Sequence, residues 1–485
     1  MSTGILWLRR DLRLTDNPAL SAAAAECARL LPVYIHAPGE EAPWQPGAAS
    51  NWWLHHSLQR QHAALRRLGS RLVMLRAESS LQALSRLIAE TGATRVYWNR
   101  LYEPWAVARD GQIKRELALQ GCEVASYNSA LLHEPWHLTK ADGTPYKVFT
   151  PFWKALLKAG VDQDVQAAPA RLPPPPSQVK EQSAGDLGLL PRIPWDAGFK
   201  GRWMPGEAGA QQALQVFLEQ KLEAYALARD LPHEPGTSGL SPHLHFGEIG
   251  PRQLMRALLQ QSSRLPEAAG RGGADRFAAE LGWREFACNL LYHFPSSAEK
   301  PLHTRFDHFP WSVDYQYRLG GWQRGETGIP IVDAGMRELW HDGWMHNRVR
   351  MIVASLLTKN LLIPWQEGAR WFWDTLLDAD LASNTLGWQW VAGCGADAAP
   401  YFRIFNPVLQ GRRFDPDGAY VRRWLPELRR LPERFVHAPW EASESVLMQA
   451  GVHLGEDYPR PIVDLKVSRA AALAAFDQMK RRNGF

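Results

Sequence analysis

Two carboxylates, an amide and two indoles stand close together in residues 378–390, DADLASNTLGWQW. Asp378 and Asp380 follow the apolar and aromatic run WFWDTLL, where a charge without a partner would be costly. A guanidinium can stabilise such a carboxylate, and Arg350 in GWMHNRVRM is a candidate if the two segments face each other. These residues predict the wall of a binding site in which a buried ion pair lies beside aromatic rings.

Three other stretches carry residues that could serve a site. EPGTSGLSPHLHFG combines glycines with hydroxyls that suit phosphate oxygens at a helix start, although a capped turn has the same composition. In AAELGWREFACNLL, Glu280 and Arg284 are four residues apart, which predicts a surface ion pair unless a buried site uses them. His346, in GWMHNRVRM, begins a polar run that is either a solvated helix face with a satisfied histidine or a second wall of the site.

The elements that must position these residues fall into two unlike halves. Residues 1–130 alternate short apolar runs with helical segments, and Asn17 before Pro18 is typical of a helix start. This alternation predicts an α/β domain with a doubly wound parallel sheet. There is no GxGxxG after the first strand and no P-loop, so a dehydrogenase or a P-loop enzyme is poorly supported. We expect strands at 4–8, 30–36, 71–76, 95–99 and 122–128.

The remainder of the chain is predicted to be a linker and a large helical domain. Residues 131–205 have no clear pattern, and the proline-rich stretch 168–185 predicts an extended connector. Helical periodicity dominates residues 206–485, which we expect to form an all-α domain. The helical segments are expected at 208–230, 250–262, 274–293, 330–342, 345–362 and 366–380.

Composition narrows the classes of protein further. The net charge of +5 and the pI of about 9.0 permit a polyanionic partner without requiring one. The four cysteines are scattered, which argues against a disulfide framework and a metal site and fits a reducing cytoplasm. No apolar run approaches the ~20 residues of a membrane span, and the N-terminus does not read as a signal peptide. We expect a cytoplasmic protein that does not cross a membrane.

Five motifs then occur in order: TSGLSPHLHFG, WREF, GWMHNRVRM, DADLASNTLGWQW and AAPYFRIFNP. Together with the opening LWLRRDLRLTDNPAL, they resemble the DNA photolyase/cryptochrome family, most closely a class I or class III cyclobutane pyrimidine dimer photolyase. The resemblance implies an α/β antenna-type domain and an all-α domain that binds FAD in a U shape. It also implies light-driven repair, in which excited reduced FAD passes an electron to a flipped-out dimer and recovers it after the ring opens.

The resemblance assigns residues to the flavin. An uncharged amide at Asn384, facing flavin N5, can support a negatively charged reduced flavin, whereas plant-type cryptochromes have an aspartate at this position. The amide therefore favours repair over signalling. The matching residues are Tyr225, Thr237, Ser238, Leu240 and Ser241 near the pyrophosphate, Arg284 from WREF, and Arg350, Asp378, Asp380 and Asn384 around the ribityl and isoalloxazine portions.

The resemblance also assigns a pocket for a dimer taken out of the duplex. His346 lacks the second histidine, near Met351, that enzymes acting on 6-4 photoproducts have, so a cyclobutane dimer is expected. The matching residues are Trp283 and Trp390 against the dimer, Glu280 and Asn347 on its bases, Met351 on the floor, and Arg229 and Arg348 on phosphates. Among these, Glu280, Asn347 and Met351, together with Asn384, are the expected catalytic residues. An electron relay maps onto Trp388, Trp365 and Trp311, the last of which requires a one-residue gap in the match.

Several alternatives stay open. The chain could be a blue-light photoreceptor without repair activity, although no long output segment follows the helical domain, or a protein that binds single-stranded nucleic acid. An antenna chromophore is expected to be methenyltetrahydrofolate, with a deazaflavin or none as alternatives, because Trp105 and Ala106 replace the Asn–Glu pair of some folate-binding members. The expected partner is UV-damaged DNA, single- or double-stranded, and the protein is expected to be a monomer without a metal.

Overall fold

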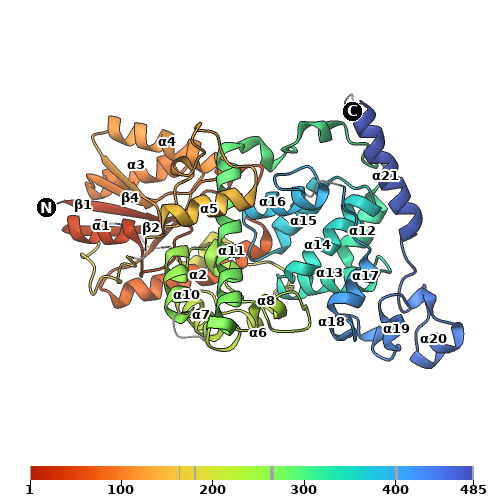
Figure 1. Cartoon of the computed structure of the whole chain (residues 1–485). Coiled ribbons are helices and arrows are strands. Elements are labelled where there is room, and N and C mark those ends of the chain that lie inside the picture. Colours follow the sequence, from red (N-terminus) through yellow and green to blue (C-terminus); the bar gives the residue numbers. More distant parts are fainter. Residues whose placement is uncertain are drawn as a thin grey trace.

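The N-terminal part of the chain forms a parallel sheet with helices on both faces (Figure 1). The computed structural model describes residues 2–162, 164–177, 179, 182–262, 267–398 and 402–482. Five strands lie in the order β3-β2-β1-β4-β5 and pair in parallel, as predicted. The elements are β1 (Thr3–Leu8), α1 (Pro18–Glu26), β2 (Arg29–His36), α2 (Ala48–Arg67), β3 (Val73–Arg76), α3 (Ser80–Thr91), β4 (Arg95–Asn99), α4 (Pro104–Leu119) and β5 (Glu123–Tyr127).

The central strand, β1, is apolar throughout because both of its faces are covered. Every residue of β1 is buried. Leu6 and Leu8 belong to the core that holds α1 and α2, whereas Ile5 and Trp7 pack on the other face with α3 and α4. A strand that is covered on both faces reads as a continuous apolar run rather than as an alternation. The predicted cap also forms, since the Asn17 side chain accepts a hydrogen bond from the Leu20 N–H (3.1 Å).

Residues 131–205 contain more regular structure than the predicted linker. α5 (Phe149–Ala159) and α6 (Ala197–Arg202) are helices in this range. Phe152 and Leu156 of α5 are buried in the same core as residues of α11, so a short apolar stripe anchors the helix. Short helices of this kind are fixed by tertiary packing, which local patterns do not reveal. The predicted connector 168–185 contains neither helix nor strand over 168–177, as expected, but its end enters a 3-10 helix, Ala184–Leu187, that the sequence pattern did not predict.

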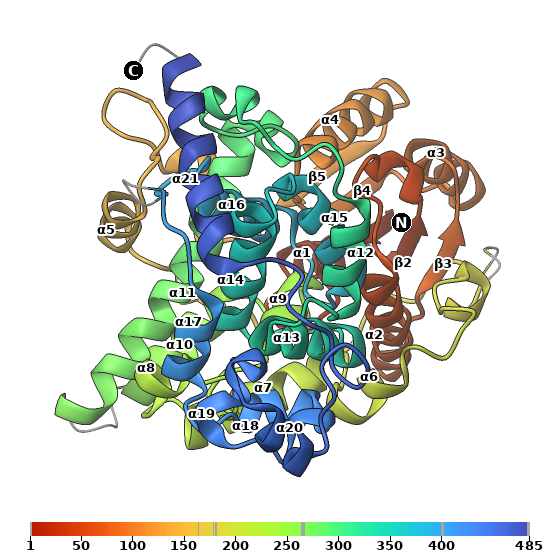
Figure 2. The ribbon, with the colours of Figure 1, turned by 90° about the vertical axis from the view of Figure 1, so that its right-hand side faces the viewer.

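The second half is helical (Figure 2). The predicted segment 208–230 is two helices, and the segment 345–362 continues from α14 into a π-helical turn, Leu356–Asn360. The segment 366–380 ends early, so Asp378 and Asp380 lie in the connection to the next helix. Among the described residues, none of the helices combines the length and apolar character that a membrane crossing needs. The helices are α7 (Glu207–Gln220), α8 (Tyr225–Ala228), α9 (Ser241–His245), α10 (Pro251–Ser262), α11 (Glu267–His293), α12 (Gln316–Arg324), α13 (Pro330–Asp342), α14 (Asn347–Ser355), α15 (Trp365–Thr375), α16 (Leu381–Ala392), α17 (Pro407–Phe414), α18 (Ala419–Trp424), α19 (Glu433–Val436), α20 (Glu444–Ala450) and α21 (Leu465–Arg482).

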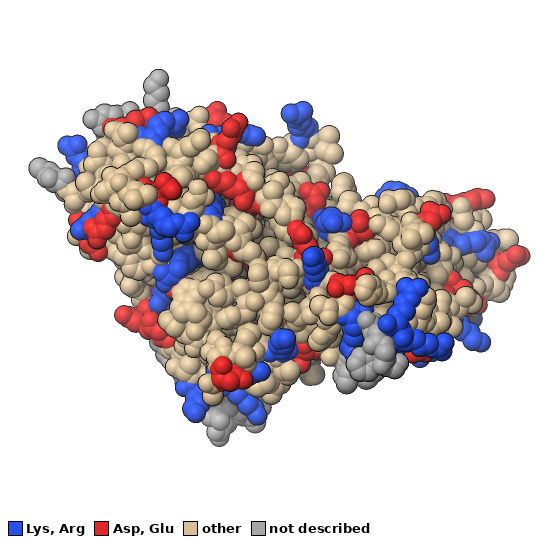
Figure 3. Space-filling model, turned by 90° about the horizontal axis from the view of Figure 1, so that it is seen from above, with Lys and Arg blue, Asp and Glu red and all other residues tan. Residues whose placement is uncertain are grey.

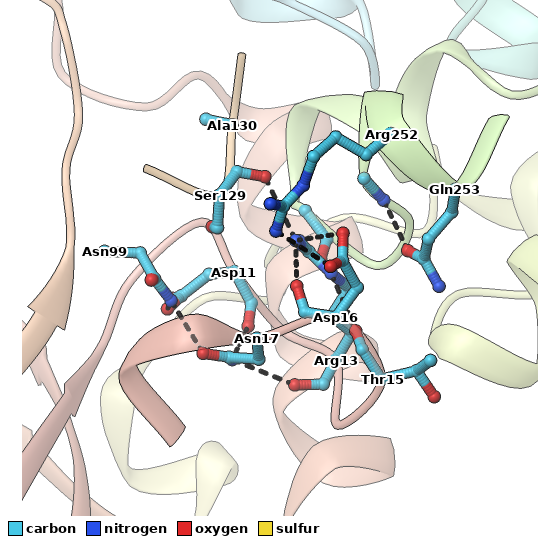
Figure 4. Close-up of polar contacts among 12 residues, drawn as sticks. Asp11, Arg13, Thr15, Asp16, Asn17, Asn99, Ser129, Ala130, Arg252 and Gln253 are labelled. Atoms are coloured by element: carbon cyan, nitrogen blue, oxygen red, sulfur yellow. Dashed lines mark hydrogen bonds and ion pairs between the residues drawn. The ribbon is translucent and has the colours of Figure 1, made fainter. Parts of the chain in front are cut away.

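A buried ionic cluster joins the two halves (Figure 4). The Arg13 guanidinium, 1% exposed, donates to the carbonyl oxygens of Gly247 (2.9 Å) and Ser129 (3.0 Å). The fully buried carboxylate of Asp16 accepts from Arg252 of α10 (2.8 Å) and lies 3.8 Å from Arg13. The α/β domain is therefore attached to the helical domain through buried charges. Each of these charges would be costly if its partner were absent.

We expect Asp16→Asn to destabilise the protein by about 3–5 kcal/mol, because it leaves the buried Arg13 guanidinium without its carboxylate and removes the buried partner of Arg252. Asp16 has a positive φ of 53°, which asparagine also tolerates, so backbone strain would not explain the loss. Urea unfolding measures the change. The matched control is Asp162→Asn, which removes the other, exposed carboxylate partner of Arg252 (3.3 Å) and should change stability little. Equal losses in the two variants would contradict this prediction.

Candidate functional site

The candidate site lies around α16, which packs against both α11 and α14 (Figure 2). The predicted ion pair forms at this junction. Arg350 of α14 donates through Nη2 to both carboxylate oxygens of Asp378 (3.1 and 2.9 Å) and through Nε to the Met345 carbonyl (2.7 Å). The Asp378 side chain is only 5% exposed. The two segments thus face each other, as the sequence predicts.

Asp380 carries a second buried negative charge. It is the N-cap of α16, where its carboxylate accepts from the Ser383 N–H (2.8 Å). Burial by itself would raise the pKa of Asp380, but the positive charges of Arg284 and Arg10 and the Ser383 hydrogen bond outweigh burial and lower it. Arg284 and Asp380 line one cavity together with Arg10 and His245. The carboxylate therefore stays ionised.

Asn384 and Trp388 lie one turn apart on α16 and rest against α15. The Asn384 amide donates to the Ala369 carbonyl (3.0 Å), which leaves its carbonyl oxygen free to accept a hydrogen bond. Trp388 covers Gly368, where a Cβ atom would collide with the indole ring. Glycine is required at this position because the two helices approach closely there.

The three predicted relay tryptophans run from the interior to the surface. Trp388 and Trp365 are buried, and Trp311 is half-buried. Trp365 lies three residues before Gly368 on α15, and the residue after Trp311 donates its N–H to the Leu362 carbonyl (2.8 Å). Trp365 and Trp311 also line one surface groove. The relay in the order Trp388, Trp365, Trp311 stays a prediction.

The glycine- and hydroxyl-rich loop lies against α8. Gly236 approaches the Ala228 carbonyl so closely that a side chain would not fit. Thr237 and Ser238 are half-buried, Ser241 is exposed, and Leu240 is in the core. Leu240 can therefore contribute only its backbone. The ring of Tyr225 packs against two phenylalanines, and burial raises the pKa of its hydroxyl to about 12.

The residues assigned to the substrate form a charged network. Arg229 pairs with Glu280, and Arg348 donates to Asp230 (2.8 Å). The i, i+4 pair between Glu280 and Arg284 does not form, because Arg284 donates instead to the Ala130 carbonyl (2.7 Å). Both arginines assigned to phosphates are thus already held by carboxylates.

The remaining substrate residues surround this network. Asn347 is exposed at the first position of α14, and the Met351 sulfur lies 3.9 Å from an Arg348 nitrogen. Trp283 of α11 and Trp390 of α16 are half-buried. One helical turn of α14 thus carries Arg350, which faces the buried ion pair, and Met351, which faces the network.

Unpartnered polar atoms test whether the site fits an anionic cofactor. Among the described residues, the buried Nε atoms of Arg229 and Arg348 and Nε2 of His346 have no hydrogen-bond partner. Burial lowers the pKa of His346 to about 4, and its Nδ1 accepts from the Arg348 N–H (3.2 Å), so the neutral ring carries its proton at Nε2. All three atoms are then donors. A set of buried donors without acceptors fits an anionic ligand that is rich in oxygen atoms.

Sequence reasoning missed residues that reach the site from other elements. Arg10 and His245 act on Asp380, and Phe149, in the predicted linker, stacks on Trp283 with the ring centroids 3.8 Å apart. The opening motif LWLRRDLRL contains Arg10 but gives no indication of a partner so distant in sequence. Residues 399–401 of the motif AAPYFRIFNP lie outside the described residues.

Comparison with known proteins gives matches along the whole chain. Residues 277–478 match a family model described as the FAD binding domain of DNA photolyase, and residues 4–176 match a model described as DNA photolyase. A deoxyribodipyrimidine photo-lyase of Agrobacterium fabrum is 47% identical over 98% of both chains. Cryptochrome-2 of Arabidopsis thaliana is 40% identical over 98% of this chain and 79% of its own length. The crystal structure of a bacterial class III photolyase from Agrobacterium tumefaciens superposes with a TM-score of 0.94 at 46% identity, covering 99% of this chain and 98% of that chain.

Proposed function

This chain belongs to the DNA photolyase/cryptochrome family and acts as a DNA photolyase, and we propose that it restores cyclobutane pyrimidine dimers in DNA under light. The proposal rests on one observation: α14 contributes residues to both sides of the site. Arg350 points to Asp378 on the cofactor side, whereas Arg348 and Met351 belong to the charged network on the substrate side. A cofactor and a substrate held by one helical turn are close enough for an electron to pass between them.

FAD supplies the light-driven electron when it is bound and reduced. We propose that Arg350 and Asp378, together with Arg284 and Asp380, hold the flavin and ribityl portions, and that Tyr225 and the loop from Thr237 to Ser241 hold the pyrophosphate region. The cavity that Arg284 and Asp380 line also includes His245, whose buried Nδ1 has no hydrogen-bond partner among the described residues, and this supports a polar ligand there. Asn384 keeps its carbonyl oxygen free toward flavin N5, since its amide nitrogen is used by Ala369.

The substrate pocket is proposed to use Glu280, Asn347 and Met351 on the bases, with Trp283 and Trp390 as flat walls. Glu280 is held by Arg229 when no DNA is bound, so we propose that entry of the dimer exchanges this partner and frees Arg229 for a phosphate. On the face shown in Figure 3, acidic and basic side chains are interspersed. We propose that the protein acts as a cytoplasmic monomer on single- and double-stranded damaged DNA.

A light-dependence assay tests the proposed function. Reduced protein is incubated with an oligonucleotide that contains one thymine cyclobutane dimer, and the restored thymines are counted by chromatography after blue light or darkness. We expect restoration only in the light and none with an oligonucleotide that contains a 6-4 photoproduct. Equal results in light and darkness would favour the alternative, a photoreceptor of cryptochrome type without repair activity.

A pocket at the α/β domain is the proposed place of an antenna chromophore. It encloses about 720 Å³, partly open to solvent, and is lined by residues that include Trp7, Tyr34 and Trp105. Arg109 lies over both indoles (4.8 and 5.0 Å to the ring centroids). Aromatic walls of this size suit a planar chromophore, which we propose to be methenyltetrahydrofolate, with a deazaflavin or none as alternatives.

We expect Trp105→Ala to lower the amount of a second chromophore in the purified protein, because the variant removes one aromatic wall of this pocket. Absorption spectra and chromatography of the released cofactors measure both chromophores, and the FAD content should stay unchanged. Trp136→Ala is the matched control, since Trp136 is a partly exposed indole just after the α/β domain that does not line the pocket. A wild-type protein that contains FAD alone would leave the pocket without an antenna and contradict this assignment.

A further inference from the structure

Three aromatic rings form a parallel stack that ends at Trp283. The rings of Phe149 and Trp283 are 3.8 Å apart at an interplanar angle of 7°, and those of Phe149 and Trp153 are 6.3 Å apart at 9°. Phe149 and Trp153 are both on α5, whereas Trp283 is on α11. The stack therefore attaches a helix of the segment between the domains to one wall of the proposed substrate pocket.

The sequence of α11 makes room for this stack. A Cβ atom at Gly282 would lie 2.5 Å from the ring of Trp153, so only glycine lets α5 come this close. Phe286, one turn further along α11, meets both Phe149 (6.0 Å) and Trp283 (5.8 Å) edge-on. Trp283 thus stacks on Phe149 and meets Phe286 edge-on, and both are preferred geometries for aromatic pairs.

Asp397 lies between α5 and Trp390, the other proposed wall of the substrate pocket. Its carbonyl oxygen accepts a hydrogen bond from Nε1 of Trp390 (3.1 Å). Burial raises the pKa of its carboxyl group, and the nearby backbone N–H of Phe149, at the first residue of α5, opposes that rise. Asp397 has a positive φ of 51°, an uncommon conformation for this residue type. The loop after α16 is therefore held in one geometry that serves Trp390 and α5 together.

We infer that Phe149 and Asp397 are positioning residues that set the distance between Trp283 and Trp390, and so the fit of the pocket to a pyrimidine dimer. The inference rests on the proposed function, because it takes these two indoles as the walls that receive the dimer. Neither Phe149 nor Asp397 contacts the bases in this arrangement. They act on recognition through the indoles, so their loss should reduce the preference for damaged DNA rather than DNA affinity in general.

The test measures dissociation constants in the dark for a dimer-containing oligonucleotide and for its undamaged counterpart. We expect Phe149→Leu to reduce the preference for the dimer by about three- to tenfold, because it removes the stacked ring. Phe149→Tyr keeps the ring and should retain the preference. Asp397→Ala should resemble Phe149→Leu, whereas Asp397→Asn keeps an acceptor for the Phe149 N–H and should recover most of the preference.

Phe152→Leu is the matched control, because this buried ring of α5 packs on Phe286 and is not in the stack. FAD content and light-driven FAD reduction serve as a second measurement that each variant is folded. An unchanged preference in Phe149→Leu, or an equal loss in Phe152→Leu, would overturn the inference. A wild-type protein that shows no preference for the dimer would instead overturn the proposed function.

Discussion

In a Trp388→Phe variant, we expect light to leave the bound FAD oxidised in the presence of an external thiol, under conditions in which the wild-type protein reduces it. Phenylalanine preserves a buried aromatic ring against Phe372, whose centroid lies 5.0 Å from that of Trp388. It gives up an electron far less readily than an indole, so the first step of the proposed relay is lost. Absorption spectra recorded during illumination measure the reduction. Repair by the chemically reduced variant should persist, because the relay is not needed once the flavin is reduced.

Trp322→Phe is the matched control for this prediction. Its indole lies 6.2 Å from Trp388, is 0% exposed and donates to the Val353 carbonyl (3.1 Å). It contacts Trp388 without leading to the surface, so its replacement should leave photoreduction unchanged. Rapid photoreduction in Trp388→Phe would contradict the relay. An unaffected Trp311→Phe variant would remove only the terminal assignment, which depends on the weakest motif match.

The sheet could be predicted because its information is local. The strands β1, β2 and β4 are short, largely buried apolar runs between helical segments, and parallel strands covered on both faces leave this pattern directly in the sequence. The cap at Asn17 is local as well. The Arg350–Asp378 pair could be predicted because a carboxylate after an aromatic run requires a cation, and the nearby helix offered one.

The rest of the site depends on contacts between elements far apart in the sequence. Arg10 of the α/β domain acts on Asp380 across about 370 residues, a distance in sequence that no spacing rule connects. Phe149 stands in a segment without a clear pattern and gains its place only when α5 docks on Gly282. The i, i+4 spacing suggested that Glu280 pairs with Arg284, but in the folded protein Glu280 pairs with Arg229. Side-chain partners are selected by packing, whereas periodicity specifies only the element that carries them.

The second large effect is expected for Arg350→Met. The variant leaves the Asp378 carboxylate, 5% exposed, without its bidentate partner, at a cost of about 3–5 kcal/mol in the free energy of unfolding. We also expect the variant to purify with little or no FAD, because the proposed contact to the cofactor is lost together with the geometry of Asp378. Urea unfolding and the ratio of flavin to protein absorbance measure the two effects separately.

The double variant Arg350→Met/Asp378→Asn shows whether the pair serves the cofactor or only the fold. It contains no buried unpaired charge, so most of the lost stability should return even though neither original group is present. If the pair only stabilises the junction of α14 and α16, FAD content should return with stability. If Arg350 and Asp378 hold the cofactor, the protein should be stable and still lack FAD, which is the outcome we expect. Lys359→Met provides the comparison, because this buried lysine donates to the Ala392 carbonyl (2.6 Å) but is not among the residues assigned to the flavin. Its replacement should affect stability without a selective loss of FAD, so that loss of a basic side chain from the helical domain and loss of a cofactor contact can be told apart.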